Sequence, residues 1–181
     1  MRIRISVVAA AAAFVLAAAG PPAAGAATIA GRPTLEARVV HRINLVREAH
    51  GLHRVRVVAR LSGAAHRHAG SMGAAAYFRH GLFTPKRDPD WTSFGRWIRW
   101  FYPGPGYSSW SAGENLAWGA PGIGARETVA RWMASPMHRA NVLEPSWRNV
   151  GVGAVHVTAP TGYWRDWDSV TIVVADFGRR S

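Results

Sequence analysis

Apolar residues recur at helical spacing in three separate parts of the chain. Segments 35–50, 59–77 and 125–134 each carry an apolar stripe, which predicts three amphipathic helices. The stripes consist of Leu35, Val39, Ile43 and Val46, then Leu61, Ala65, His68 and Met72, then Val129, Trp132 and Met133. His68 therefore points inward, and a single histidine on an apolar stripe is expected to be a hydrogen-bonded core residue rather than a ligand.

The periodicity changes near residue 150. Segments 150–157 and 169–177 read as strands, the first of them apolar on both faces. Because helices come first and paired strands last, the order predicts an α+β fold with a small antiparallel sheet.

Residues 82–111 are expected to be irregular apart from a short helix over 94–101. Five tryptophans lie in this stretch or just beyond it, at positions 91, 97, 100, 110 and 118. Such aromatic density predicts either a groove for an apolar or sugar ligand or a small core beneath a long loop.

The first 27 residues have the features of a signal peptide. Arg2 and Arg4 precede an apolar run over 5–19, and Ala24-Gly25-Ala26 has the small-residue pattern of a cleavage site. The run is shorter than the roughly 20 apolar residues that span a bilayer. We therefore expect a secreted, extracellular and monomeric protein with no stable membrane span in its mature form.

The formal net charge is +12, from 22 Lys and Arg against 10 Asp and Glu. This charge favours anionic partners such as a cell-envelope polymer or lipid headgroups. The arginines are scattered rather than gathered into a basic run, so no nucleic-acid partner is expected. The chain has no cysteine, which excludes disulfides and thiol chemistry.

Three sequence-distant polar residues are the candidate site. His80 follows the second predicted helix, Glu114 lies in the run Gly113-Glu114-Asn115-Leu116-Ala117, and His138 follows the third helix after Ser135-Pro136. Two imidazoles and a carboxylate could bind a zinc-like cation, act as acid and base, or tie three loops together. The residues alone leave these three readings open.

The same residues resemble the CAP superfamily of cysteine-rich secretory, antigen 5 and pathogenesis-related proteins, in its secreted bacterial branch. The match rests on Phe78-Arg79-His80, on the Gly113 run, on Trp132 to Leu143 and on Val150-Gly151-Val152-Gly153. It places a CAP domain at 35–178 after a short lead-in over 28–34. The resemblance implies an α-β-α sandwich with a central antiparallel sheet.

The resemblance also implies a groove that holds two histidines and two acids and binds zinc or another divalent cation in some members. Carried over by position, the metal and candidate catalytic residues are His80, Glu114 and His138. The second acid does not carry over, because Ser135 occupies its position and Glu127 lies two turns earlier on the helix.

The expected function is a non-catalytic binding module for a lipid, a sterol or a cell-envelope ligand. The alternative is a metal-assisted hydrolase of peptide or peptidoglycan, with Glu114 as acid and base. A third hypothesis, adhesion to an anionic surface through arginine, predicts binding that collapses with added salt.

Overall fold

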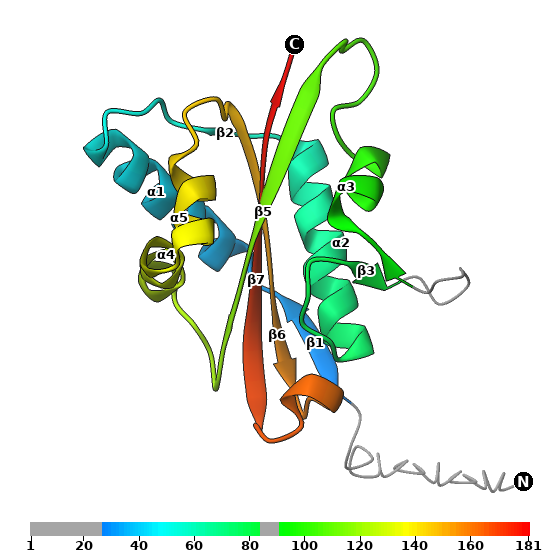
Figure 1. Ribbon diagram of the computed structural model, residues 1–181. Coiled ribbons are helices and arrows are strands. Elements are labelled where there is room, and N and C mark those ends of the chain that lie inside the picture. Colours follow the sequence, from blue (N-terminus) through cyan, green and yellow to red (C-terminus); the bar gives the residue numbers. More distant parts are fainter. Residues whose placement is uncertain (1–26, 84–90) are drawn as a thin grey trace, which may run out of the picture.

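The computed structural model describes residues 27–83 and 91–181, which form a sheet with helices on both faces (Figure 1). The helices are α1 (Pro33–Ala49), α2 (Ala59–Ala75), α3 (Phe94–Trp97), α4 (Ala125–Ala134) and α5 (Pro136–Leu143), with 3₁₀ turns at Ile98–Trp100 and Gly162–Trp164. The strands are β1 (Thr28–Gly31), β2 (Arg56–Val57), β3 (Leu82–Phe83), β4 (Trp91–Thr92), β5 (Trp110–Gly119), β6 (Asn149–Thr158) and β7 (Ser169–Arg180). The predicted signal peptide lies outside the described residues except for Ala27.

The main sheet has the strand order β1-β6-β7-β5, and all of these neighbours are antiparallel. The short strand β2 adds a parallel pairing to β6. The expected α+β class with an antiparallel sheet between helices is confirmed. Residues 28–31, expected as part of a lead-in, instead form β1 and pair with the end of β6.

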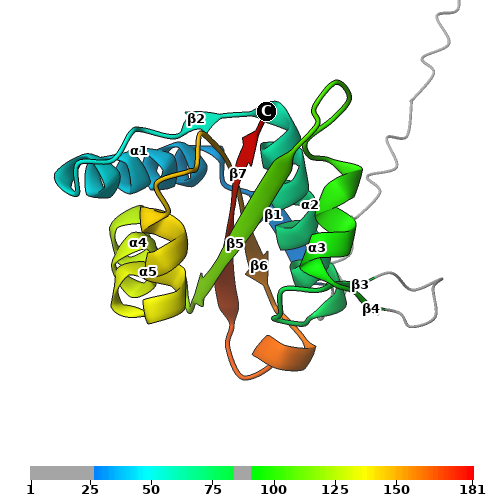
Figure 2. The ribbon, with the colours of Figure 1, turned by 45° about the horizontal axis from the view of Figure 1, so that its top comes forward.

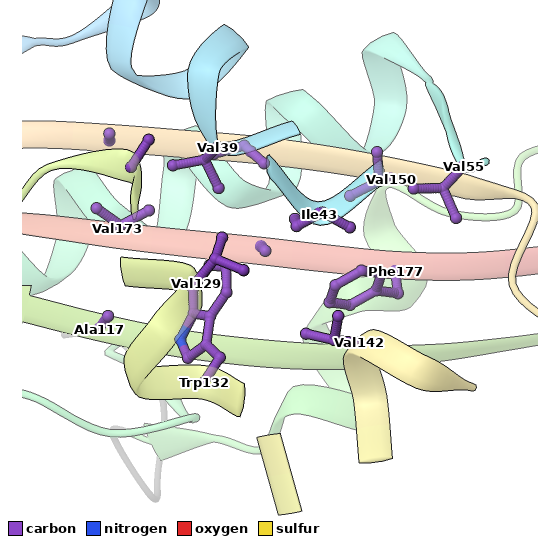
Figure 3. Packing of buried hydrophobic residues seen from close by; sticks show 14 of the residues in the cluster. Val39, Ile43, Val55, Ala117, Val129, Trp132, Val142, Val150, Val173 and Phe177 are labelled. Carbon is purple, nitrogen blue, oxygen red and sulfur yellow. The ribbon is translucent and has the colours of Figure 1, made fainter. Parts of the chain in front are cut away.

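Two helical layers cover the sheet. Figure 2 shows α1, α4 and α5 on one side and α2 with α3 on the other. Alternate residues of β7 pack against the two helical layers, because successive side chains of a strand point to opposite faces of the sheet. Val173, Ala175 and Phe177 pack in the α1–α4–α5 layer. Figure 3 shows Val173 and Phe177 together with Ile43, Val129 and Trp132 of this layer. Val170, Ile172 and Val174 pack in the other layer.

Helix α2 lies directly against the backbone of β6. A Cβ added to Gly151 would stand 2.0 Å from the carbonyl carbon of Leu61, and one added to Gly153 would stand 2.4 Å from that of Ala65. Glycine at both positions therefore lets the helix and the strand make backbone contact. This contact sets the height of α2 above the sheet and hence the position of His68.

The tryptophan-rich stretch contains more regular structure than expected. Within it, the described residues form β3, β4, α3 and the first part of β5. Trp97 is fully buried and packs with Leu61 and Tyr102, so part of this stretch forms a small core against α2. Trp100, in contrast, is 47% exposed.

Over residues 27–83 and 91–181, no helix combines the length and apolar character needed to cross a membrane.

Candidate functional site

Strand β5 carries Glu114 at the edge of the sheet, with its side chain on the face covered by α2. The carboxylate is only 1% exposed, yet both of its oxygens have partners. His68 Nδ1 lies 2.6 Å from Oε2, and His80 Nδ1 lies 2.9 Å from Oε1. A carboxylate offers only acceptors, so each Nδ1–H donates to it. Glu114 therefore orients two imidazole rings and leaves their Nε2 atoms as the remaining polar groups.

His68 comes from the inner face of α2 and is fully buried. Its ring contacts Trp97 edge-on, with the centroids 5.2 Å apart. The expectation of a hydrogen-bonded core histidine is confirmed. Its partner, however, is Glu114, so this core residue also belongs to the candidate site. Its Nε2 has no hydrogen-bond partner within the described part of the chain.

His80 lies on the turn that follows α2. The helix ends at Ala75, and the left-handed backbone of the next residue, Ala76 (φ 52°), turns the chain away from the helix axis. The His80 side chain is 56% exposed, and its backbone carbonyl accepts a hydrogen bond from Trp97 Nε1 at 3.4 Å. A hollow of about 430 Å³ opens between His80 and Phe94. This imidazole is thus oriented on one side by Glu114 and accessible on the other.

Glu114 and Asn115 are neighbours on β5, so their side chains lie on opposite faces of the strand and have different partners. Asn115 points away from Glu114, and its Nδ2 donates to the backbone carbonyl of His138 in α5 at 2.9 Å. Asn141, one turn further along α5, donates from Nδ2 to the carbonyl of Glu114 at 3.1 Å. A side chain at Gly113 would meet Asn141 Oδ1 at 2.8 Å, so glycine makes room for this contact.

Helices α4 and α5 also cover the hydrogen-bonding edge of β5. Among the described residues, β5 is the last strand on this side of the sheet, so its outward-facing carbonyls need other partners. Trp132 Nε1 donates to the carbonyl of Leu116 at 2.9 Å, and Arg131 Nη1 donates to that of Trp118 at 2.9 Å. With Asn141 on Glu114, three alternate carbonyls of the edge are satisfied by side chains. These bonds hold α5, and with it His138, against the edge.

His138 reaches His80 across this edge. The two ring centroids are 6.5 Å apart, with 42° between the ring planes. Burial, and secondarily the neighbouring His80, lowers the pKa of His138 below its ordinary value. A lowered pKa keeps the imidazole neutral at physiological pH, and a neutral ring has a nitrogen lone pair available for a cation or a donor group.

Asp176 is a second acid beside Glu114, and sequence reasoning did not assign it to the site. It lies directly opposite Glu114 on β7, so both side chains share one face of the sheet. Asp176 is fully buried, and neither carboxyl oxygen has a hydrogen-bond partner among the described residues. Burial, and then the negative charge of Glu114, raises the pKa of Asp176 well above its ordinary value. In the sequence, Asp176 could have been noticed as a single acidic residue within an otherwise apolar strand.

The structure brings His80, Glu114 and His138 together around β5, but the three side chains differ in their exposure to solvent. His80 and His138 stand near each other at the surface, whereas Glu114 lies behind His80 and is engaged by two rings. Within residues 27–83 and 91–181, no set of three or more His, Asp or Glu side chains is placed to hold a metal ion. Binding of a metal by His80, Glu114 and His138 together therefore stays a prediction. Ser135 and Glu127, considered for the missing acid, belong to α4 and its end.

Comparison with known proteins gives consistent matches. The family model described as CAP, cysteine-rich secretory protein family, matches residues 40–177. The uncharacterized protein YkwD of Bacillus subtilis is 32% identical over 120 residues, which cover 66% of this chain and 42% of that protein. The chain thus spans less than half the length of this curated relative.

Two solved structures share the fold. An extracellular protein containing an SCP domain from Bacillus anthracis superposes with a TM-score of 0.60 at 20% identity, covering 81% of this chain and 41% of that one. An outer surface protein from Borrelia burgdorferi superposes with a TM-score of 0.57 at 22% identity, covering 79% of this chain and 90% of that one. Since the family model spans most of the sequence, this cysteine-free chain belongs to the cysteine-rich secretory protein (CAP) family.

Proposed function

We propose that this CAP protein is a secreted, non-catalytic binding module whose ligand is a lipid, a sterol or a cell-envelope polymer. The ligand site is the surface around His80 and His138. The main support for this proposal is that Glu114 is already engaged. Its two carboxylate oxygens are hydrogen-bonded to His68 and His80, and its side chain is only 1% exposed. Among residues 27–83 and 91–181, the one acid bonded to the exposed histidine is thus a positioning group.

This state of Glu114 weighs against the alternative of a metal-assisted hydrolase. A general acid or base must come within hydrogen-bond reach of the proton that it transfers. Glu114 lies behind the His80 ring and would have to break one of its two bonds to meet a substrate. Asp176 is fully buried and its raised pKa favours the neutral acid, so it does not supply the missing base.

The exposed part of the site suits a divalent cation such as zinc with only two protein ligands. His80 and His138 would hold it, while Glu114 would fix the orientation of His80 from behind, as carboxylates commonly do for metal-bound histidines. The cation would supply a positive anchor for an oxygen of the ligand. Two ligands rather than three or four predict weak binding compared with a closed zinc site.

Secretion is part of the proposal. Two observations support it: residues 1–27 have the pattern of a signal peptide, and the structural neighbours are described as an extracellular protein and an outer surface protein. Detection of the mature chain in the culture medium, beginning after Ala26 or Ala27, tests this part. Retention of the unprocessed chain inside the cell would contradict it.

Ligand binding is tested by tryptophan fluorescence and thermal unfolding with a panel of lipids, sterols and envelope glycans. Trp97 donates to the His80 carbonyl, so binding near His80 should change its emission. A ligand that binds only the folded state should also raise Tm with concentration. We expect both effects to be lost in a His80→Ala/His138→Ala variant. They should be kept in a His41→Ala/His50→Ala control, because His41 is exposed on α1 and His50 is exposed directly after it. No response to any panel member would contradict the proposal.

A further inference from the structure

Three aromatic rings gather at the end of the sheet beyond the histidine pair. Trp118 closes β5, and Tyr163 and Trp167 come from the connection between β6 and β7. We call these three residues the aromatic patch. Trp118 and Trp167 have centroids 4.8 Å apart at 68°, and Trp118 and Tyr163 are 5.9 Å apart at 86°. Tyr163 is 51% exposed and Trp167 is 40% exposed, so two of the rings face the solvent over a large area.

The patch rests on a rigid base. Trp164 is fully buried below the patch. Its ring centroid lies 5.4 Å from that of Tyr163 and 6.1 Å from that of Trp118. The backbone N–H of Tyr163 donates to the carbonyl of Ala76 at 3.0 Å, which ties the connection to the end of α2. In an edge-to-face pair, the contact fixes the tilt of each ring relative to the other. Exposed ring faces are therefore held in place before any ligand arrives.

The connection that supplies Tyr163 and Trp167 differs in net charge from the whole chain, and the nearby Arg131, which bonds the Trp118 carbonyl, is itself paired with Glu127. The connection carries Arg165, Asp166 and Asp168, all exposed, and so has one more negative than positive charge, in a chain of net charge +12. An anionic bilayer or an anionic polymer would meet like charge at this position. The same side chains offer one hydrogen-bond donor group and two acceptor groups beside the exposed rings.

We propose that the aromatic patch binds an uncharged glycan chain, with sugar rings stacked on Trp167 and Tyr163. The axial C–H face of a pyranose is apolar and suits a ring face, while its equatorial hydroxyls need polar partners, which Arg165, Asp166 and Asp168 supply. Rigid, exposed aromatic residues with a polar rim are typical of binding hot spots. The inference rests on the proposed binding function and names its ligand class.

The patch continues the surface that holds the histidine pair. Trp118 and Glu114 are four residues apart on the same face of β5, a distance of about 13 Å along the strand. Phe78 links the aromatic patch to the histidine pair. Its ring centroid lies 5.9 Å from that of Tyr163, and His80 follows two residues later in the chain. An oligosaccharide of a few rings is long enough to contact both regions.

Titration calorimetry with β-1,4-linked N-acetylglucosamine oligomers tests the inference on the whole protein. Trp167→Ala and Tyr163→Ala should each weaken binding at least about tenfold, as truncation of an aromatic hot spot does. Trp100→Ala is the matched control, because Trp100 is similarly exposed but lies in the 3₁₀ turn Ile98–Trp100. Unfolding curves establish that each variant is folded, and Tyr163→Phe should retain most of the affinity because it keeps the ring.

The outcomes separate this inference from the proposed function. Oligomer binding that is unaffected by Trp167→Ala and Tyr163→Ala but lost in the His80→Ala/His138→Ala variant would overturn the aromatic site and support the proposed function. Binding only to phosphatidylglycerol vesicles would likewise overturn it. No binding to oligomers, vesicles or sterols would overturn both.

Discussion

Glu114 and Asp176 lie directly opposite each other on β5 and β7, with both carboxyl groups on the face that α2 covers. In the part of the chain that the structure describes, His68 and His80 donate hydrogen bonds to Glu114, whereas neither carboxyl oxygen of Asp176 has a partner. The two acids therefore have different environments, and a second negative charge beside Glu114 would be both buried and repelled. A neutral Asp176 avoids placing a second buried negative charge beside the carboxyl group that bonds His68 and His80.

Asp176→Asn is expected to stabilise the protein more at neutral pH than at acidic pH. The folded-state pKa of Asp176 is raised, so its contribution to stability is full below the unfolded-state value and is lost as pH rises through the folded-state value. Asparagine is nearly isosteric and does not titrate. Urea unfolding of both proteins at pH 4 and pH 7.5 should show a stability difference that grows with pH in favour of the variant. A difference independent of pH would show that Asp176 does not titrate abnormally.

Glu114→Gln should cost about 1–3 kcal/mol of unfolding free energy, because the glutamine NH2 is a donor and would face one of the two imidazole N–H groups, and because His68 is buried. His80→Ala is the comparison, since it removes only the exposed partner and should cost less than about 1 kcal/mol. Urea unfolding at pH 7 measures both. The order of the two losses is the test, and a larger loss in His80→Ala would mean that Glu114 is not held mainly by His68.

Gly151→Ala should be severely destabilising, by at least about 3 kcal/mol, because its Cβ would overlap the backbone of α2 at Leu61 and Ser62. Gly70→Ala is the matched control within α2. A Cβ there meets nothing within 4 Å, so the variant should gain about 0.5–1 kcal/mol from the better helix former. Thermal unfolding distinguishes the two, and a Gly151→Ala protein as stable as the wild type would refute backbone contact between α2 and β6.

The His138 imidazole should titrate below the ordinary histidine value in an NMR pH series. Its pKa is lowered first by burial and second by His80. His80→Gln should therefore raise the midpoint only partly toward the ordinary value. A midpoint at or above the ordinary value in the wild-type protein would place His138 in a different environment.

Much of the fold could be predicted from apolar periodicity. The stripes of α1, α2 and α4 and the runs of β6 and β7 are long enough to give a clear signal. Strand β5 could not be recognised in this way, because both of its faces are covered and its centre carries Gly, Glu and Asn, which are unfavourable in strands. Strand β1 is short and exposed along its whole length, so it has no apolar alternation to detect.

The candidate site was predicted in part. His80, Glu114 and His138 could be selected by motif, but the depth of Glu114 depends on where α2 lies above the sheet. In the sequence, His68 cannot be distinguished from any other histidine on an apolar helix face. Its place in the site becomes evident from its hydrogen bond to Glu114. Asp176 depends on strand register, because only the pairing of β5 with β7 places it beside Glu114.

His80 and His138 reach each other from opposite sides of β5 and are expected to act as one site. Zinc titration of the mature protein, followed by the NMR signals of the imidazole rings and by metal analysis, tests it most directly. His80 and His138 should respond together at a single equivalent of zinc. The His80→Ala/His138→Ala variant should lose this response, while His41→Ala/His50→Ala should keep it. Separate responses of the two rings, or zinc uptake unchanged in the His80→Ala/His138→Ala variant, would contradict it.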